Sequence, residues 1–176
     1  MVTGRAAAGA AHTVLTTRLG HVTVVSENGI LTGLYFPRHW PRPDRMAFGP
    51  RVDEGFDDAA VQLEEYLSGR RHDFELPMTA SGSEFDLRVW QLISDVPYGQ
   101  TTTYGDLARM LGPGTDPRDV GAAVGRNPLC ILIPCHRVVG STGKLTGYAG
   151  GLDRKRALLE IERAAVQAGR IPAGLW

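Results

Sequence analysis

The chain has no net charge, few cysteines and no long hydrophobic run. Lysine and arginine number 19, as do aspartate and glutamate, so overall charge alone does not indicate a nucleic-acid partner. No segment approaches the roughly 18 consecutive apolar residues of a transmembrane helix, so we expect no membrane association. The opening MVTGRAAAGAAH lacks a long apolar core, which predicts a flexible tail and not a secretory signal.

Cysteine occurs only twice, at Cys130 and Cys135. Both lie in the apolar run LCILIPCHRVV, residues 129–139, and such runs are typical of buried strands. In a strand this spacing would put the two side chains on opposite faces. We therefore expect no disulfide, and a reducing, cytoplasmic setting. The spacing does not match the usual Cys-x2-4-Cys pattern of zinc sites, and no second cysteine cluster exists, so the sequence predicts no metal.

The charges are unevenly distributed along the chain. Residues 1–84 hold 8 Lys or Arg against 11 Asp or Glu, whereas residues 85–156 hold 9 against 6. The excess of basic residues favours an anionic partner for the second part, and a random scatter of charge is equally compatible with it.

The first half of the chain predicts a small α/β unit. Residues 12–36 alternate apolar and polar side chains around turn signals such as Asn28-Gly29, which predicts two or three antiparallel strands joined by hairpins. The Pro- and Arg-rich residues 37–51 predict a loop, and the amphipathic residues 57–69 predict a helix that ends at a glycine. RRHDFELPM, residues 70–78, predicts one more short strand.

The second half predicts helices. The loop TASGS, residues 79–83, marks the expected boundary between domains 1–83 and 84–176. EFDLRVWQLISDV, residues 84–96, predicts a helix with one packed side that includes Leu87, Trp90 and Ile93.

Two short helices joined by a Gly/Pro turn follow. Thr103 with Asp106 forms a start resembling a capping box for the first of them. Asp116 is a good N-cap for the second, which is expected to end near Arg126. The pair is a helix-turn-helix candidate, although many helical hairpins bind nothing.

The second of these helices has unusually small side chains along much of its length, because it contains Gly121, Ala122, Ala123 and Gly125. Small residues let a helix backbone approach another surface closely. That surface is either a second helix or a groove of nucleic acid.

The pair Cys135-His136 is the chemical feature of the chain. A free thiol has a pKa near 8.5, so a cysteine that reacts at neutral pH needs a base or a positive environment. In an extended chain neighbouring side chains point apart, which favours a water between the two residues. The base would need a carboxylate, and Glu160 and Glu162 are candidates. A buried structural cysteine and a cysteine hydrolase remain open alternatives on chemistry alone.

At this point a resemblance to a known family enters. The segment IPCHRVVGSTGKLTGYAGGLDRKRALLEIE resembles the active-site region of the O6-alkylguanine-DNA alkyltransferases, also called methylated-DNA–protein-cysteine methyltransferases. FDLRVWQLISDVPYGQTTTYGDLA and PRDVGAAVGRNP match the same family in order and spacing, so the resemblance covers about residues 84–163. It implies an α/β (α+β) fold with a ribonuclease H-like N-terminal domain containing a small antiparallel sheet. The C-terminal domain would be mainly helical and carry the helix-turn-helix.

The resemblance also implies a function. Members flip an alkylated guanine out of double-stranded DNA, approached from the minor groove, and move the O6-alkyl group to a cysteine in one irreversible turnover. O4-alkylthymine is expected as a further substrate. No cofactor, membrane or obligate protein partner is implied, and a monomer is expected. The rival hypotheses are a non-catalytic binder or regulator of alkylated DNA and a cysteine hydrolase.

Residue roles carry over by matching position. Cys135 is the expected alkyl acceptor, His136 the base acting through water, and Glu162 the carboxylate that orients it. The family members that bind zinc hold it with cysteines of the N-terminal domain. This chain has no cysteine before Cys130, so no zinc site is expected.

The remaining matches concern DNA and the pocket. Tyr104 matches the tyrosine that assists rotation of the nucleotide, and Arg118 matches the arginine that fills the space left by the flipped base. Asn127 matches the brace between the recognition helix and the active site. Tyr148 matches a pocket wall, and Lys155 matches a lysine near the site whose charge serves phosphate or the helix.

Three small residues complete the match. Gly121 and Ala122 would allow a shallow approach to a narrow groove. Ala149 stands where the family normally has a serine, so its backbone N–H is still expected to reach the guanine oxygen while the hydroxyl is lost.

Overall fold

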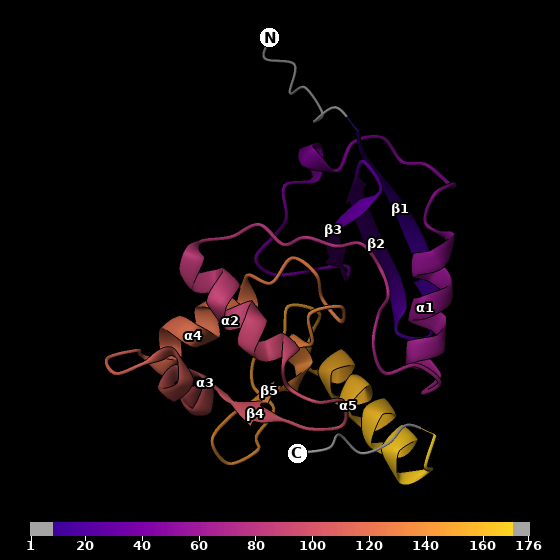
Figure 1. Cartoon of the computed structure of the whole chain (residues 1–176). Helices are drawn as coiled ribbons and strands as arrows, with labels where there is room; N and C mark the ends of the chain where they lie inside the picture. Colours follow the sequence, from indigo (N-terminus) through magenta and orange to yellow (C-terminus); the bar gives the residue numbers. More distant parts are fainter. Residues whose placement is uncertain (1–8, 171–176) are drawn as a thin grey trace.

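The computed structural model describes residues 9–170 and has a mixed α/β fold, as predicted. Figure 1 shows a small sheet and α1 gathered at one end of the molecule and α2, α3 and α4 at the other. Within the described residues no helix combines the length and apolar character needed to cross a membrane. Residues 1–8 of the predicted tail lie outside the described residues, and the division after residue 83 stays a prediction.

A three-stranded antiparallel sheet of order β1-β2-β3 forms from the predicted strand region. Its strands are β1 (Ala10–Thr17), β2 (Gly20–Glu27) and β3 (Ile30–Tyr35). Asn28 and Gly29 both have positive φ, at 51° and 81°, which is the geometry of the hairpin turn that the Asn-Gly pair predicts. Val22, Val24 and Leu34 are buried in the core that α1 (Asp57–Leu67) covers.

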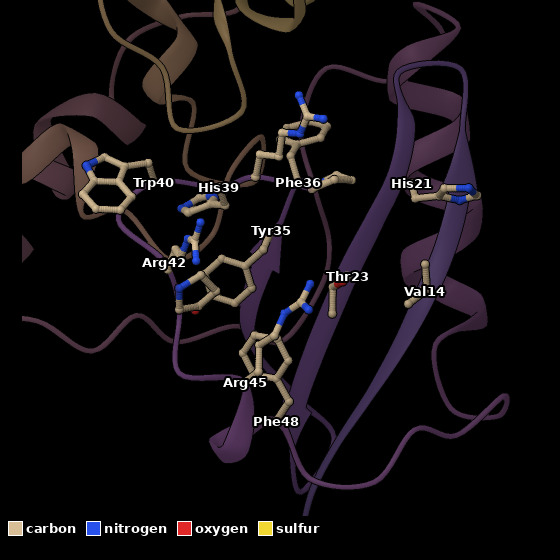
Figure 2. Close-up of a pocket in the computed structure, with 13 residues that line it drawn as sticks. Val14, His21, Thr23, Tyr35, Phe36, His39, Trp40, Arg42, Arg45 and Phe48 are labelled. Atoms are coloured by element: carbon tan, nitrogen blue, oxygen red, sulfur yellow. The ribbon is translucent and has the colours of Figure 1, made fainter.

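The other face of the sheet is hollowed. Val14 pairs with Thr23 and Thr23 with Tyr35, so these side chains share one face. Together with the loop of residues 37–51 they line a cavity of about 680 Å³, and Figure 2 shows Trp40 on the side of it away from Val14. The predicted loop contains one turn of 3-10 helix, η1 (Arg45–Phe48).

The strand predicted for residues 70–78 is wrong. Met78 makes only an isolated bridge to Leu31 at the sheet edge. The Pro77 carbonyl accepts from the Leu31 N–H at 2.8 Å, and the Thr79 N–H donates to the Leu31 carbonyl at 2.9 Å. Pro77 has no N–H to donate, so the ladder does not extend.

Helices are the main elements of the second half of the chain. They are α2 (Glu84–Ser94), α3 (Tyr104–Leu111), α4 (Pro117–Gly125) and α5 (Leu152–Gln167). On α2 the predicted packed side is correct for Trp90 and Ile93 and wrong for Leu87, which is 45% exposed. Val89 lies in the core in its place, because it is on the same side of the helix as Ile93.

The predicted helix-turn-helix is formed by α3 and α4. The Thr103 hydroxyl accepts from the Asp106 N–H at 3.0 Å and caps α3. The Asp116 carboxylate accepts from the Arg118 N–H at 2.8 Å and caps α4. The buried Trp90 indole donates to the Ala123 carbonyl at 2.9 Å, which fixes α4 against α2.

The apolar run of residues 129–139 is buried, but it is not the strand that its composition predicts. Ile131 has a φ of 71°, which breaks an extended chain, and Cys135–Arg137 form a 3-10 turn, η2. Only β5 (Val138–Val139) is extended, paired in parallel with β4 (Thr102–Thr103). This pairing brings the start of α3 beside the Cys135 turn (Figure 1).

Candidate active site

Cys135 lies on a turn that buried hydrogen bonds hold in place. The Asn127 side chain accepts from the Leu129 N–H and donates to the Ile133 carbonyl, both at 2.9 Å. The Cys135 N–H then donates to the same Ile133 carbonyl at 2.8 Å. Asn127 is 1% exposed, so these bonds are protected from water and fix where the thiol points.

The two cysteines are neighbours, and the expectation of opposite faces is wrong. Both are free thiols, and because the chain turns at Ile131 the Cys130 side chain lies close enough to influence the pKa of Cys135. The bond from Cys130, opposed by burial and assisted by Asn127 and the charge of Lys155, lowers the pKa of Cys135. The same bond and burial raise the pKa of Cys130 well above its ordinary value. Cys135 is therefore the thiol that ionises first.

His136 and Glu162 form a buried pair directly behind the thiol. The His136 Nε2 lies 2.6 Å from Glu162 Oε1, and neither side chain is exposed. His136 Nδ1 is buried and has no partner within the described residues. Burial lowers the pKa of His136, which favours the neutral ring. A neutral ring with Nε2–H on the carboxylate leaves the Nδ1 lone pair free to accept a proton.

Glu162 is held by more donors than His136 alone. The Arg137 Nε lies 3.1 Å from both carboxylate oxygens, and the Gly99 N–H donates to Oε2 at 2.8 Å. The Tyr66 hydroxyl donates to Oε1. Although burial opposes ionisation, the bonds and charges of His136 and Arg137 lower the pKa of Glu162 to about 2. The carboxylate is thus charged at any physiological pH.

A cavity of about 550 Å³ opens onto Cys135. Its walls come from four parts of the chain: the loop before η1, the helix-turn-helix, the η2 turn, and the loop before α5. They comprise Trp40, Pro41, Tyr104, Gly121, Ala122, Val124, Gly125, Arg126, Cys135, Gly147, Tyr148 and Ala149. The volume falls within the range of about 300–1,000 Å³ typical of small-molecule sites. On the α4 side, Gly121, Ala122 and Gly125 add little bulk to the wall, which leaves room for a large ligand.

Lys155 ties the loop before α5 to the reactive turn. Its ammonium donates to the carbonyls of Val138 at 2.6 Å, Thr146 at 2.8 Å and Gly147 at 3.0 Å. Burial lowers the pKa of Lys155 to about 8. The Tyr104 hydroxyl donates to the same Thr146 carbonyl at 3.1 Å. Lys155 therefore binds backbone oxygens and does not extend toward a phosphate.

The structure brings most of the predicted site residues together. Ten of the eleven lie in the cavity wall or in the hydrogen-bonded turn and relay behind it. Arg118 is the one apart: it is exposed at the start of α4 and does not line the cavity. Between the two candidate carboxylates, Glu162 contacts His136 and Glu160 is exposed.

Sequence reasoning missed several residues at the site. Trp40 reaches the cavity from a loop with no pattern to indicate it, and Tyr66 reaches Glu162 from α1. Arg137 follows His136 directly, and its position beside a catalytic candidate was the available signal. Within residues 9–170, no three His, Cys, Asp or Glu side chains are grouped to hold a metal ion. The absence of a metal stays a prediction.

Comparison with known proteins gives the same picture. Residues 84–164 match the DNA-binding domain of 6-O-methylguanine DNA methyltransferase, and residues 11–80 match the ribonuclease-like domain of that family. The methylated-DNA–protein-cysteine methyltransferase of Mycobacterium bovis is 40% identical over 151 residues, which are 85% of this chain and 90% of that protein.

Two further relatives agree. The inducible methylated-DNA–protein-cysteine methyltransferase of Bacillus subtilis is 42% identical over 120 residues, 68% of this chain and 67% of that protein. A crystal structure of Mycobacterium tuberculosis OGT in complex with DNA superposes with a TM-score of 0.80 at 37% identity, over 88% of this chain and 93% of that one. The chain therefore belongs to the 6-O-methylguanine DNA methyltransferase family.

Proposed function

We propose that the chain repairs DNA by direct reversal, taking the alkyl group from O6-alkylguanine onto its own Cys135. One observation carries this proposal: a thiol with a lowered pKa, backed by a buried His-Glu pair, faces a cavity large enough for a base. O4-alkylthymine is a further substrate of the same chemistry, because it also carries an alkyl group on an exocyclic oxygen of the base. The reaction needs no cofactor.

The relay prepares the nucleophile. His136 Nδ1 takes the Cys135 proton through a bridging water, and Glu162 stabilises the imidazolium through Nε2–H. The Cys130 thiol donates to the resulting thiolate. Burial alone would raise the pKa of Cys135, so these partners must offset the cost of a buried charge.

Alkyl transfer is then a displacement at carbon. The Cys135 sulfur forms a bond to the alkyl carbon, and the bond from that carbon to guanine O6 breaks. The electron pair stays on the guanine, which leaves as an anion and takes up a proton from water, while the proton lost by Cys135 stays on His136 until the solvent removes it. The Tyr104 hydroxyl, which donates to the Thr146 carbonyl in the free protein, turns toward the base and stabilises the developing charge. The thioether is not readily hydrolysed, so each molecule acts once.

DNA is bound through the helix-turn-helix. The nearly bare surface of α4 suits the narrow minor groove, and Gly121 and Ala122 lie where the flipped base enters the cavity. Arg118 is exposed at the start of α4, and its proposed role is to enter the gap that the base leaves. We propose residues 1–83 and 84–176 as the two domains, the monomer as the acting form, and the cytoplasm as the location, where thiols stay reduced.

The test is an intact mass with peptide mapping after incubation with a duplex that contains O6-methylguanine. We expect one added methyl group per molecule, on Cys135, after which the reaction stops. The Cys135→Ser variant should bind the damaged duplex and gain nothing.

Other outcomes select the rivals. Binding to the damaged duplex with no mass gain in the native protein would support the non-catalytic binder. Repeated turnover of a soluble ester or amide, with no response to DNA, would support the cysteine hydrolase.

A further inference from the structure

A tyrosine from the first half of the chain reaches the catalytic relay. Tyr66 lies on α1, 70 residues before His136, and is 1% exposed. Its hydroxyl donates to Glu162 Oε1 and lies 3.2 Å from His136 Nε2. Its ring packs on those of Phe74 and Tyr98 at centroid distances of 5.0 and 5.7 Å, which fixes the direction of the hydroxyl.

The hydroxyl and the imidazole use the same carboxylate oxygen. The His136 Nε2–H donates to Glu162 Oε1 at 2.6 Å, which is where the Tyr66 hydroxyl also donates. A second donor on that oxygen takes up part of its negative charge. Less charge is then left to stabilise a proton on His136. A base that is protonated in the resting state cannot accept the thiol proton, so this competition matters for the reaction.

We propose that Tyr66 is a positioning residue for alkyl transfer, which keeps His136 neutral and oriented by sharing the Glu162 oxygen that the imidazole uses. The proposal rests on the proposed function, because it concerns the activation of Cys135. It makes the ribonuclease-like part of the chain a contributor to the chemistry. Tyr66 touches neither the thiol nor the cavity, so it acts only through the relay.

Tyr66 faces His136 as a neutral donor, and other titratable or charged groups also lie around the ring. Burial and the neighbouring carboxylate raise the pKa of Tyr66 well above its ordinary value, so its hydroxyl stays a donor throughout the physiological range. The remaining titratable or charged groups around the ring and its carboxylate come from η2, α5 and the segment after α2. They are Cys135, Arg137, Lys155, Glu162 and Tyr98.

The variant Tyr66→Phe tests the proposal, and Tyr98→Phe is its matched control. Both changes remove one buried phenol hydroxyl from the same aromatic cluster and keep the ring. The Tyr98 hydroxyl has no hydrogen-bond partner in the part of the chain that the structure describes, whereas the Tyr66 hydroxyl has two. A difference between the variants therefore reports the relay and not the packing.

The measurement is the single-turnover rate of methyl transfer from an O6-methylguanine duplex at saturating DNA, between about pH 5 and pH 8. In Tyr66→Phe the Glu162 oxygen holds the imidazolium more strongly, so the midpoint of the acid limb should move to higher pH. We expect a rate about tenfold lower on the acid limb, equivalent to ~1.4 kcal/mol, and within about twofold of native on the plateau. Affinity for the duplex should not change.

The amplitude of the reaction separates folding from chemistry. A variant that partly unfolds transfers less methyl in total, while its folded molecules keep the native rate and midpoint. A native midpoint in Tyr66→Phe would overturn the proposal, as would the same shift in Tyr98→Phe. No methyl transfer by the native protein would instead refute the proposed function, and the role of Tyr66 with it.

Discussion

Replacing Glu162 with glutamine gives the sharpest test of the relay, because the side chain keeps its shape and loses its charge. Glu162 is fully buried and accepts bonds from four groups. In Glu162→Gln the buried Arg137 loses its charged partner, which typically costs about 3–5 kcal/mol. We also expect alkyl transfer to slow, since His136 loses the anion that stabilises its imidazolium.

The free energy of unfolding should depend on pH in a way that reports the ionisation of Glu162. The pKa of Glu162 falls from an ordinary 4.5 to about 2 in the folded protein, so the unfolded chain binds its proton first. The stability that this group contributes is therefore present above about pH 4.5 and is lost as the pH falls toward 2. The difference corresponds to ~3 kcal/mol at neutral pH, of which ~2 kcal/mol is gone at pH 3.

Urea unfolding at pH 7 and pH 3 measures this contribution. Between the two pH values, Glu162→Gln should lose ~2 kcal/mol less stability than the native protein, because glutamine does not titrate. Glu160→Gln is the control, since Glu160 lies on the same helix and is exposed. If acidification destabilised Glu162→Gln as much as the native protein, the inference that Glu162 is charged and paired would be refuted.

Three further predictions concern the thiol and the DNA surface. Cys130→Ala removes the donor to Cys135, so the pH curve for alkylation of Cys135 by iodoacetamide should move to higher pH; an unchanged curve would contradict the assigned bond. In Gly121→Ala the new Cβ meets the Tyr104 ring at 3.7 Å, an ordinary contact. Thermal stability should then rise by about 0.5–1 kcal/mol while affinity for the lesion duplex falls, and unchanged affinity would remove α4 from the interface. Arg118→Ala should leave stability within about 0.5 kcal/mol and weaken DNA binding with a smaller dependence on salt, and an unaltered salt slope would exclude it from the DNA surface.

Most of the fold could be predicted because local signals agreed with the final packing. The hairpin at Asn28-Gly29 and the caps at Thr103 and Asp116 depend on neighbouring residues, and all three formed as expected. The strand predicted for residues 70–78 was wrong for a local reason that the sequence itself contains, because Pro77 lacks the N–H that would continue the pairing.

The candidate site could be predicted where its residues belong to a local motif, and not where long-range packing brings them in. Cys135, His136 and Glu162 could be named from motif matches, and the structure brings them together. The composition of the run around Cys135 predicted a strand, because residue type does not reveal the positive φ of Ile131. Trp40 and Tyr66 could not be predicted, since long-range packing alone brings them to the site.

Helix α5 shows how a sequence pattern can indicate a site even without a motif. Its buried residues are Lys155, Leu158, Glu162 and Ala165, a spacing that follows one face of a helix. Two of the four are charged, and a buried charge is retained only where partners satisfy it. Here Lys155 donates to the carbonyl of Val138, and Glu162 accepts from His136. The two charged side chains therefore hold the residues directly before and after Arg137. Leucine at position 155 would leave the carbonyls of Val138, Thr146 and Gly147 without this donor, and leucine at position 162 would leave both His136 and the buried Arg137 without their carboxylate, so the two charged residues of α5 both hold the turn in place and supply the partner of its base.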